Sequence, residues 1–294
     1  MEGVDATFWR SAVSRKPGVL VTFDARYQLG VEGLLGSLLA TTQDANSFEL
    51  YVASPEPHIS LAMAVVERAI QHGFSAQVLP YPSEYGMRFP VFGHVSGTTY
   101  ARLFCIERIE AERLIYLDCD VLLRHDIGEL INFELGSSPV AAALDLLHPT
   151  WSSPGNPIGQ LNGESPYFNA GVLVIDAEAW RSRGLSGRSE HFLQLHADRV
   201  RFWDQDALNY ACQGEWKALP HHWNVFPHDR IGTGVRFPYL GESVFSLKDL
   251  SNLQANAFAM HYVGRRKPWQ SDYPVKGDSL RHREARAIWN HESS

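Results

Sequence analysis

Short apolar runs alternate with segments of helical periodicity over the first half of the chain. The runs occupy residues 19–23, 48–52, 76–79 and 113–117. Such short and nearly continuous apolar runs are typical of strands that are buried on both faces. Helical spacing begins at Leu34 and again at Leu61, and residues 98–109 predict a third helix. This alternation predicts an α/β fold in which helices flank a doubly wound, mostly parallel sheet.

The helix that begins near Leu61 is expected to end near Gly73. Its predicted apolar face comprises Leu61, Val65, Val66, Ala69 and Ile70. Farther along, residues 139–144 and 171–175 predict two more strands. Residues 148–166 lie between them and are rich in Pro, Gly, Ser and Asn. We expect a long surface loop there, of the kind that often acts as a lid or a binding loop.

Polar residues follow the first and the fourth predicted strands. Ligands on open α/β sheets bind beyond the carboxyl ends of the strands, which directs attention to residues 24–27 and to Asp118-Cys119-Asp120. Side chains at positions i and i+2 of an extended stretch share a face. The two carboxylates therefore form a hard oxygen site for Mg²⁺ or Mn²⁺, which can also hold a diphosphate. The same short Asp-Cys-Asp pattern also occurs where one carboxylate caps a helix and the other is solvated. The position of the pattern at a strand end favours a metal site.

A second chemical constellation occupies residues 261–269. The neutral imidazole of His261 can complete a metal site that carboxylates begin. Gly264 lets the backbone approach a phosphate closely, and Lys267 supplies positive charge to it. The alternative is a strand end followed by a basic turn. Two further residues each allow two interpretations. Asn169 can bind a sugar hydroxyl or satisfy the backbone of a turn, and Asp204 can belong to a functional site or cap a helix.

Composition and charge narrow the class of protein. The chain has 294 residues and a net charge of -7, which does not favour a nucleic-acid partner. Three widely spaced cysteines form no disulfide framework, so we expect a reducing, cytoplasmic location. No apolar segment approaches the roughly 20 residues that span a bilayer, and we expect at most peripheral contact with the inner membrane surface. Phosphate-loop, dinucleotide, serine-hydrolase and zincin motifs are absent from the sequence.

Taken in order, the stretches between residues 19 and 269 resemble the retaining glycosyltransferases of family 8. This family includes glycogenin and bacterial lipopolysaccharide galactosyl- and glucosyltransferases. The likeness is greatest to the lipopolysaccharide α-galactosyltransferases, through residues 99–103, 168–172 and 261–269. The resemblance implies a GT-A catalytic domain over residues 17–270, preceded by an extension (1–16) and followed by a tail (271–294). It also implies a UDP-galactose or UDP-glucose donor, Mn²⁺ or Mg²⁺, and a glycan or glycolipid acceptor.

The resemblance implies roles for individual residues at matching positions. The metal would be bound by Asp118, Asp120 and His261, and the diphosphate would be contacted by Gly264 and Lys267. The other implied donor-site residues are Asp24 and Tyr27 for the uracil, Cys119 in the acidic motif, Arg102, Asn169, Asp204 and Gln205 around the sugar, and Asp145 facing the sugar or the acceptor.

Two features depart from the family pattern. Relatives often carry two acidic residues, then Asn and Tyr, after the first strand, whereas this chain has Asp24-Ala25-Arg26-Tyr27, which weakens the uracil assignment. The tail after Trp269 has little apolar content, which does not favour the basic amphipathic membrane anchor of some relatives. Gln205 matches the debated nucleophile position of the family, but an amide is a poor nucleophile. We therefore expect front-face attack, with Gln205 stabilising charge.

Two other functions share these features. A nucleotidyltransferase that makes nucleotide-sugars would need a Gly-rich basic loop after the first strand, and residues 24–27 are not such a loop. A non-catalytic protein that binds sugar nucleotides or glycans remains open, although its metal ligands would have little reason to stay intact. For the acceptor, Trp151, Trp223 and Phe226 are candidates to stack on sugar rings or to pack in the core.

Overall fold

The computed structural model describes residues 12–13, 16–93, 95–151, 165–227, 235–237, 242–245 and 247–270. Almost all of the expected N-terminal extension and the whole tail lie outside the described residues, as does the middle of the expected loop at 148–166. The expectations for these segments therefore stay predictions. No helix in the described part of the chain is both long enough and apolar enough to cross a membrane.

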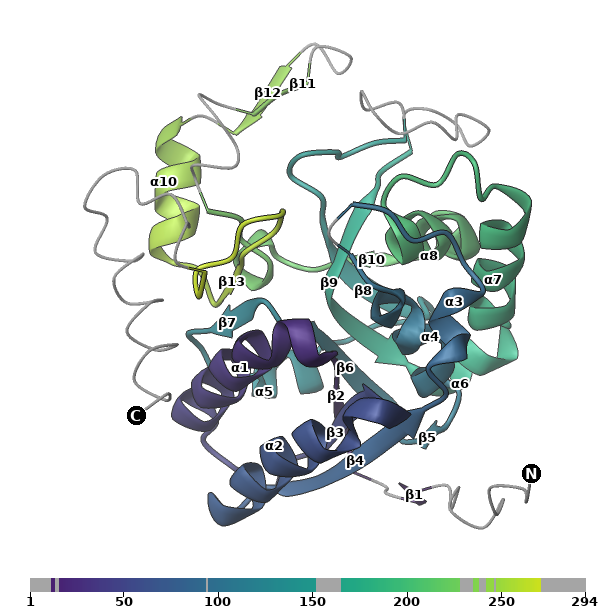
Figure 1. Cartoon of the computed structure of the whole chain (residues 1–294). Coiled ribbons are helices and arrows are strands. Elements are labelled where there is room, and N and C mark those ends of the chain that lie inside the picture. Colours follow the sequence, from purple (N-terminus) through teal and green to yellow (C-terminus); the bar gives the residue numbers. More distant parts are fainter. Residues whose placement is uncertain are drawn as a thin grey trace.

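A central seven-stranded sheet organises the protein (Figure 1). Its strand order is β10-β8-β9-β6-β2-β3-β4. The strands are β2 (Gly18–Thr22), β3 (Glu49–Pro55), β4 (Ser75–Tyr81), β6 (Arg113–Asp118), β8 (Val140–Leu144), β9 (Phe168–Asp176) and β10 (Lys217–Ala218). All pairings are parallel except those of β9, which runs antiparallel to both β6 and β8. The predicted mostly parallel α/β sheet is therefore confirmed.

Helices cover both faces of the sheet (Figure 1). The helices on one face are α1 (Gln28–Thr41) and α2 (Ile59–Gln71), and those on the other are α4 (Ala101–Ile106), α6 (Ala177–Ser182), α7 (Leu185–Leu195) and α8 (Trp203–Cys212). Strand β2 shows how side chains divide between the faces. Val19 and Val21 pack with α1 and α2, whereas Leu20 packs with the opposite cluster. Both faces of the strand are apolar because both are covered.

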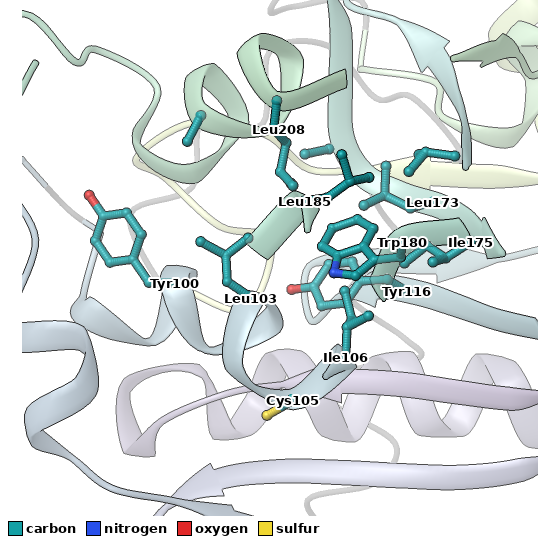
Figure 2. Packing of buried hydrophobic residues seen from close by; sticks show 14 of the residues in the cluster. Tyr100, Leu103, Cys105, Ile106, Tyr116, Leu173, Ile175, Trp180, Leu185 and Leu208 are labelled. Carbon is teal, nitrogen blue, oxygen red and sulfur yellow. The ribbon is translucent and has the colours of Figure 1, made fainter. Parts of the chain in front are cut away.

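The larger core cluster surrounds Trp180, which packs among Leu103, Ile106 and Tyr116 (Figure 2). Its indole N–H donates a 2.9 Å hydrogen bond to the hydroxyl of Ser186, which in turn donates to the Leu103 carbonyl at 2.8 Å. The one polar atom of this large side chain is thus satisfied inside the core. The three cysteines are free and buried.

The short elements complete the chain. They are β1 (Ala12–Val13), η2 (Ala25–Tyr27), η3 (Glu56–His58), α3 (Glu84–Met87), η4 (Gly97–Tyr100), β5 (Ile109–Glu110), β7 (Val121–Leu123), α5 (Gly128–Ile131), η5 (His221–Trp223), β11 (Val235–Phe237), β12 (Glu242–Phe245), α10 (Leu247–Ala255) and β13 (Ala259–His261). Strands β7 and β13 pair antiparallel outside the central sheet.

Some local expectations need correction. The predicted helix at 98–109 is shorter, because it divides into η4 and α4 and then gives way to β5. Ile70 was expected on the buried face of α2 but is 53% exposed, because that face comprises Ala62, Val65, Val66 and Ala69, and Ile70 points about 100° away from Ala69 around the helix. Strand β4 continues through Pro80, which is tolerated because β4 is an edge strand and needs no ladder donor on its open side.

Candidate active site

A cavity of 490 Å³ lies at the carboxyl ends of β2 and β6. Thr22 ends β2 and Asp118 ends β6, and both residues line the cavity. Because β9 runs antiparallel to β6, its first residues, including Asn169, reach the same edge of the sheet. All the residues that the sequence assigned to the site line this cavity, namely Asp24, Tyr27, Arg102, Asp118, Cys119, Asp120, Asp145, Asn169, Asp204, Gln205, His261, Gly264 and Lys267.

Two carboxylates and one imidazole converge in this cavity. Asp118 and Asp120 flank the turn between β6 and β7, and β13 pairs with β7 so that His261 lies opposite Val121. The His261 Nε2 atom lies 3.2 Å from Asp120 Oδ1 and 3.6 Å from Asp118 Oδ2. One ligand atom from each of the three residues lies within 4.8 Å of the others. Hard oxygen ligands with an imidazole suit a divalent cation such as Mn²⁺ or Mg²⁺.

The absence of a side chain at Gly171 makes room for this cluster. A Cβ atom there would lie 2.2 Å from His261 Cε1 and 3.0 Å from Asp118 Oδ2. Both contacts are closer than van der Waals distance, so a larger residue in β9 would displace the imidazole. The donor set and the space around it therefore fit a metal ion.

Lys267 lies beside the acidic pair and is buried. Its ammonium group forms an ion pair with Asp120 Oδ2 and donates a 3.0 Å hydrogen bond to the carbonyl of Tyr262. Burial by itself raises the pKa of Asp120, but Lys267 and His261 together hold that pKa below its usual range. Gly264, which also lines the cavity, adopts a φ of 93°, a left-handed conformation that favours glycine.

Arg102 connects Asp118, one of the three converging residues, to Asp204. Its Nη2 donates to Asp118 Oδ1 at 2.8 Å, and its Nε lies 2.6 Å from Asp204 Oδ2. A third donor, Nη1, bonds the Ala170 carbonyl at 2.5 Å, and the guanidinium lies over the ring of Tyr116 at 3.9 Å. Burial alone would lower the pKa of Arg102, but Asp204, Tyr116 and Asp118 together outweigh this effect and raise it. Arg102 therefore remains a cation that holds two carboxylates in place.

Asp204 lies at the start of α8 and does not cap that helix. The N-cap residue is Phe202, so the capping interpretation of Asp204 is wrong. The carboxylate instead accepts a 2.5 Å hydrogen bond from the Thr99 hydroxyl and pairs with Arg102. Burial raises the pKa of Asp204 to about 6, although Arg102 and Thr99 act in the opposite direction.

Asn169, Gln205 and Asp145 form a closed group of hydrogen bonds. Asn169 Nδ2 donates to Gln205 Oε1 at 3.0 Å and to Asp145 Oδ2 at 3.1 Å, and Gln205 Nε2 donates to Asp145 Oδ2 at 3.0 Å. The other oxygen of Asp145 accepts from the backbone N–H groups of Leu147 and His148 at 2.8 and 2.9 Å. These bonds fix the orientation of all three side chains before any substrate enters.

Asp24 and Tyr27 line the cavity from η2, where Asp24 is the N-cap residue and Tyr27 the last residue. Asp24 caps η2 by accepting from the N–H of Arg26 at 2.9 Å, and its second oxygen accepts from the Thr98 hydroxyl at 3.3 Å. Tyr27 contacts Trp269 edge to face, with ring centroids 6.1 Å apart. Burial raises its pKa, so the phenol stays neutral. A half-buried aromatic ring and a fixed carboxylate are suitable contacts for a heterocyclic base.

The aromatic candidates for the acceptor separate into two groups. Trp151 and Trp223 are each 2% exposed and belong to the core clusters, so the packing interpretation holds for both. Phe226 is also 2% exposed and belongs to a small core cluster, but it lines the cavity as well and contacts His261 edge to face, with ring centroids 5.6 Å apart. The sequence analysis did not single out Trp203, which also lines the cavity and stacks on Phe92 at 5.1 Å.

The backbone of Trp203 has an unusual conformation that is not evident from the sequence. Its φ is 49°, an uncommon conformation for a bulky residue, at the first position of α8 and directly before Asp204. No residue pattern encodes this backbone geometry. His148, whose pKa burial lowers, lines the cavity nearby and packs on Phe202 with centroids 4.5 Å apart. His148 is the first residue of the loop that the sequence predicted at 148–166.

The model of the family described as "Glycosyl transferase family 8" matches residues 19–273, which is most of the chain. The chain belongs to glycosyl transferase family 8. Its members transfer sugars, so the protein is a glycosyltransferase that uses a nucleotide-sugar donor and a glycan acceptor. The resemblance inferred from the sequence is thereby confirmed, and membership disfavours the nucleotidyltransferase alternative.

Relatives and solved structures agree with this assignment. General stress protein A of Bacillus subtilis (strain 168) is 25% identical over 276 residues, covering 91% of this chain and 92% of its own. Lipopolysaccharide 1,2-glucosyltransferase of Escherichia coli (strain K12) is 23% identical over 252 residues, covering 84% and 70%. The chain spans less than two thirds of several other curated relatives.

One solved structure is that of the galactosyltransferase LgtC in complex with donor and acceptor sugar analogues. It superposes with a TM-score of 0.76 at 24% sequence identity, and the match covers 94% of this chain and 95% of that chain. At this identity the likeness shows the fold alone, which is the GT-A fold expected from the sequence.

Proposed function

We propose that this protein transfers galactose or glucose, with retention of configuration, from a UDP-sugar to a hydroxyl of a glycan or glycolipid. The convergence of Asp118, Asp120 and His261 is the observation that carries the proposal. Tyr27 and Gln205 both line this cavity, so a nucleotide and its sugar have polar contacts within one space.

We propose Asp118, Asp120 and His261 as the ligands of Mn²⁺ or Mg²⁺. When bound, such a cation supplies Lewis-acid neutralisation of the charge that develops on the leaving diphosphate. Lys267 adds a second positive charge beside Asp120, and the backbone at Gly264 has the φ of an anion-binding turn. Asp24 and Tyr27 are proposed to contact the uracil.

The residues proposed to surround the sugar are expected to act through polar groups whose orientation is fixed before the substrate binds. Arg102 and Asp204 are held together, and Asn169, Gln205 and Asp145 bond one another in one fixed arrangement. Fixed dipoles of this kind stabilise a developing positive charge without reorganising during the reaction. We expect them to orient the hexose hydroxyls and to stabilise charge at its anomeric carbon.

The hydrogen bonds of Gln205 favour attack from the front face. Its Oε1 accepts from Asn169 Nδ2 and from the N–H of Ala170, both at 3.0 Å. Nucleophilic attack by this oxygen would break both bonds, which makes a weak nucleophile weaker. In the proposed step, the bond between C1 and the diphosphate oxygen breaks and its electron pair leaves with UDP. The acceptor oxygen bonds C1 on that same face, and its proton passes to the departing phosphate oxygen.

The acceptor is proposed to enter past Leu147, Phe202 and Trp203, which line the cavity beyond the sugar residues. A relative named lipopolysaccharide 1,2-glucosyltransferase supports a glycolipid acceptor. Such an acceptor would bring the protein to the cytoplasmic membrane surface, as a peripheral contact.

Release of UDP tests the proposal without knowledge of the acceptor. The purified protein would be incubated with Mn²⁺ and either UDP-galactose or UDP-glucose, with EDTA and Asp120→Ala as controls. We expect slow, metal-dependent hydrolysis of one donor, which would also identify the sugar. Calorimetric binding of UDP and Mn²⁺ without any release, even with a panel of glycan acceptors, would instead support the binding-only alternative. If the protein showed no binding of UDP and Mn²⁺ and no release of UDP, the donor assignment would be overturned.

A further inference from the structure

One buried side chain outside the cavity lining connects His261, a proposed metal ligand, to Asn169, which is proposed to lie near the sugar. Asn224 follows η5, is 1% exposed, and is held by a 3.0 Å bond from its N–H to the His221 carbonyl. Its side chain bonds His261 Nδ1 at 2.9 Å on one side and Asn169 Oδ1 at 2.9 Å on the other. Asn224 therefore bridges the two halves of the site.

The polarity of this bridge follows from one backbone group. The N–H of Gly171 bonds the Asn169 side chain at 3.0 Å, and because an N–H only donates, the Asn169 atom that it meets must be the oxygen. The group of Asn224 that faces the same oxygen must then be its NH₂. Consequently the oxygen of Asn224 faces His261 Nδ1 and requires a proton there.

A second backbone group fixes the same polarity independently. The N–H of Ala170 donates to the Gln205 side chain at 3.0 Å, so that atom is Oε1. Gln205 Oε1 also faces the Asn169 side chain, which must present its NH₂ on that side and its oxygen on the other. Two successive peptide groups of β9 thus dictate the same orientation of Asn169, and through it the orientation of Asn224.

We propose that Asn224 is a positioning residue that holds His261 as the Nδ1–H tautomer, with the Nε2 lone pair directed at Asp118 and Asp120. The inference rests on the proposed function in treating His261 as a metal ligand. A neutral imidazole binds a metal through the nitrogen that lacks a proton, so the tautomer decides whether Nε2 is available. Partners that orient a ligating histidine typically contribute 10- to 100-fold to metal affinity or activity, by roughly this mechanism.

The wild-type tautomer is the first test and needs no metal, and one variant serves only to assign the signals. Long-range ¹H–¹⁵N spectra of metal-free protein labelled at histidine would be recorded. We expect His261 to show a protonated Nδ1, with the assignment made by loss of the signals in His261→Gln. An Nδ1 without a proton would overturn the proposal even if the enzyme proves active, because the Asn224 oxygen would then have no donor there.

Two variants separate positioning from packing. Asn224→Leu keeps the volume but removes both hydrogen bonds, and we expect Mn²⁺ affinity, measured by paramagnetic resonance titration, to fall roughly 10- to 100-fold. Asn224→Asp keeps an acceptor for His261 Nδ1 but directs its second oxygen at Asn169 Oδ1. This variant should retain the tautomer and most of the Mn²⁺ affinity while kcat falls, because the sugar-side amides lose their orientation.

Asn132→Ala is the matched control. Asn132 is exposed and makes one local bond, to the Gly128 carbonyl at 2.8 Å, so both readouts should be unchanged. Wild-type affinity in a folded Asn224→Leu protein would overturn the proposal. If wild type itself fails to bind Mn²⁺, the proposed function fails, whereas the tautomer spectrum still decides the role of Asn224.

Discussion

Gly171 and His261 approach so closely that a methyl group between them would occupy the space of the imidazole. We expect Gly171→Ala to displace His261 and to weaken Mn²⁺ binding by at least about tenfold, measured by calorimetry. The crowding should also lower the free energy of unfolding by roughly 1–3 kcal/mol.

Gly187→Ala provides the control for this substitution. Gly187 lies within α7, and a Cβ there would meet no atom within 4 Å. Because alanine is a better helix former, the free energy of unfolding should rise by about 0.5–1 kcal/mol and metal affinity should not change. Unaltered Mn²⁺ affinity in Gly171→Ala would mean that His261 does not bind the metal from this position.

Arg102 should matter more for stability than any surface arginine. Its removal in Arg102→Ala leaves two carboxylates, Asp118 and Asp204, without their shared cation, and we expect a loss of about 3–5 kcal/mol in chemical denaturation. Arg102→Lys keeps the charge but cannot bond both carboxylates in the same geometry, so its loss should be intermediate. Arg199→Ala removes only an exposed 3.9 Å pair and should change stability by less than about 1 kcal/mol.

Asp204 should make stability fall as pH rises through the mildly acidic range. Its pKa is about 6 in the folded protein, above its ordinary value of 3.8, so the folded state binds the proton more tightly than the unfolded state. The contribution of this group is therefore fully present below about pH 4 and is lost as pH rises through 6, by at most about 3 kcal/mol.

Asp204→Asn isolates this effect because the amide does not titrate. Urea denaturation in EDTA from pH 4 to 7 should show that the stability of wild type, relative to Asp204→Asn, declines as pH rises. A relative stability that is constant or that increases with pH would show that the folded-state pKa of Asp204 is not raised.

Gln205 should be replaceable without complete loss of transfer. In Gln205→Ala we expect kcat to fall by roughly 10²- to 10³-fold, the usual effect of losing one preorganised polar group, with UDP affinity little changed. Mass spectrometry of wild type quenched during turnover should detect no sugar on Gln205. Abolished activity in the variant, together with a trapped glycosyl adduct in wild type, would establish the nucleophilic route instead.

The sequence predicted the strands and the chemistry at their ends because both depend on local patterns. The runs at 19–23 and 113–117 match β2 and β6, and the residues expected to share a site do line one cavity. The reversed direction of β9 left no trace in its composition, because any strand covered on both faces is a continuous apolar run. Yet that reversal is what brings Asn169 to the carboxyl edge of β6.

Residues whose importance depends on tertiary contacts could not be found this way. Asn224 lies in a short irregular segment that carries no motif, and its role emerges only from the side chains on either side of it. The same limit explains Ile70 and Trp223, since an apolar residue fits a core, a helix edge and a sugar platform equally well by type.

The pairing of β13 with β7 has a consequence for how the protein is made. Lys267 and Asp120 are 147 positions apart, and the central sheet already has its last strand at β10, before His261 and Lys267 emerge from the ribosome. A nascent or prematurely terminated chain therefore has its acidic pair but neither of the later side chains that complete it. Such a chain would lack His261, the third of the proposed metal ligands, so we expect it to show none of the metal-dependent donor hydrolysis of the complete protein.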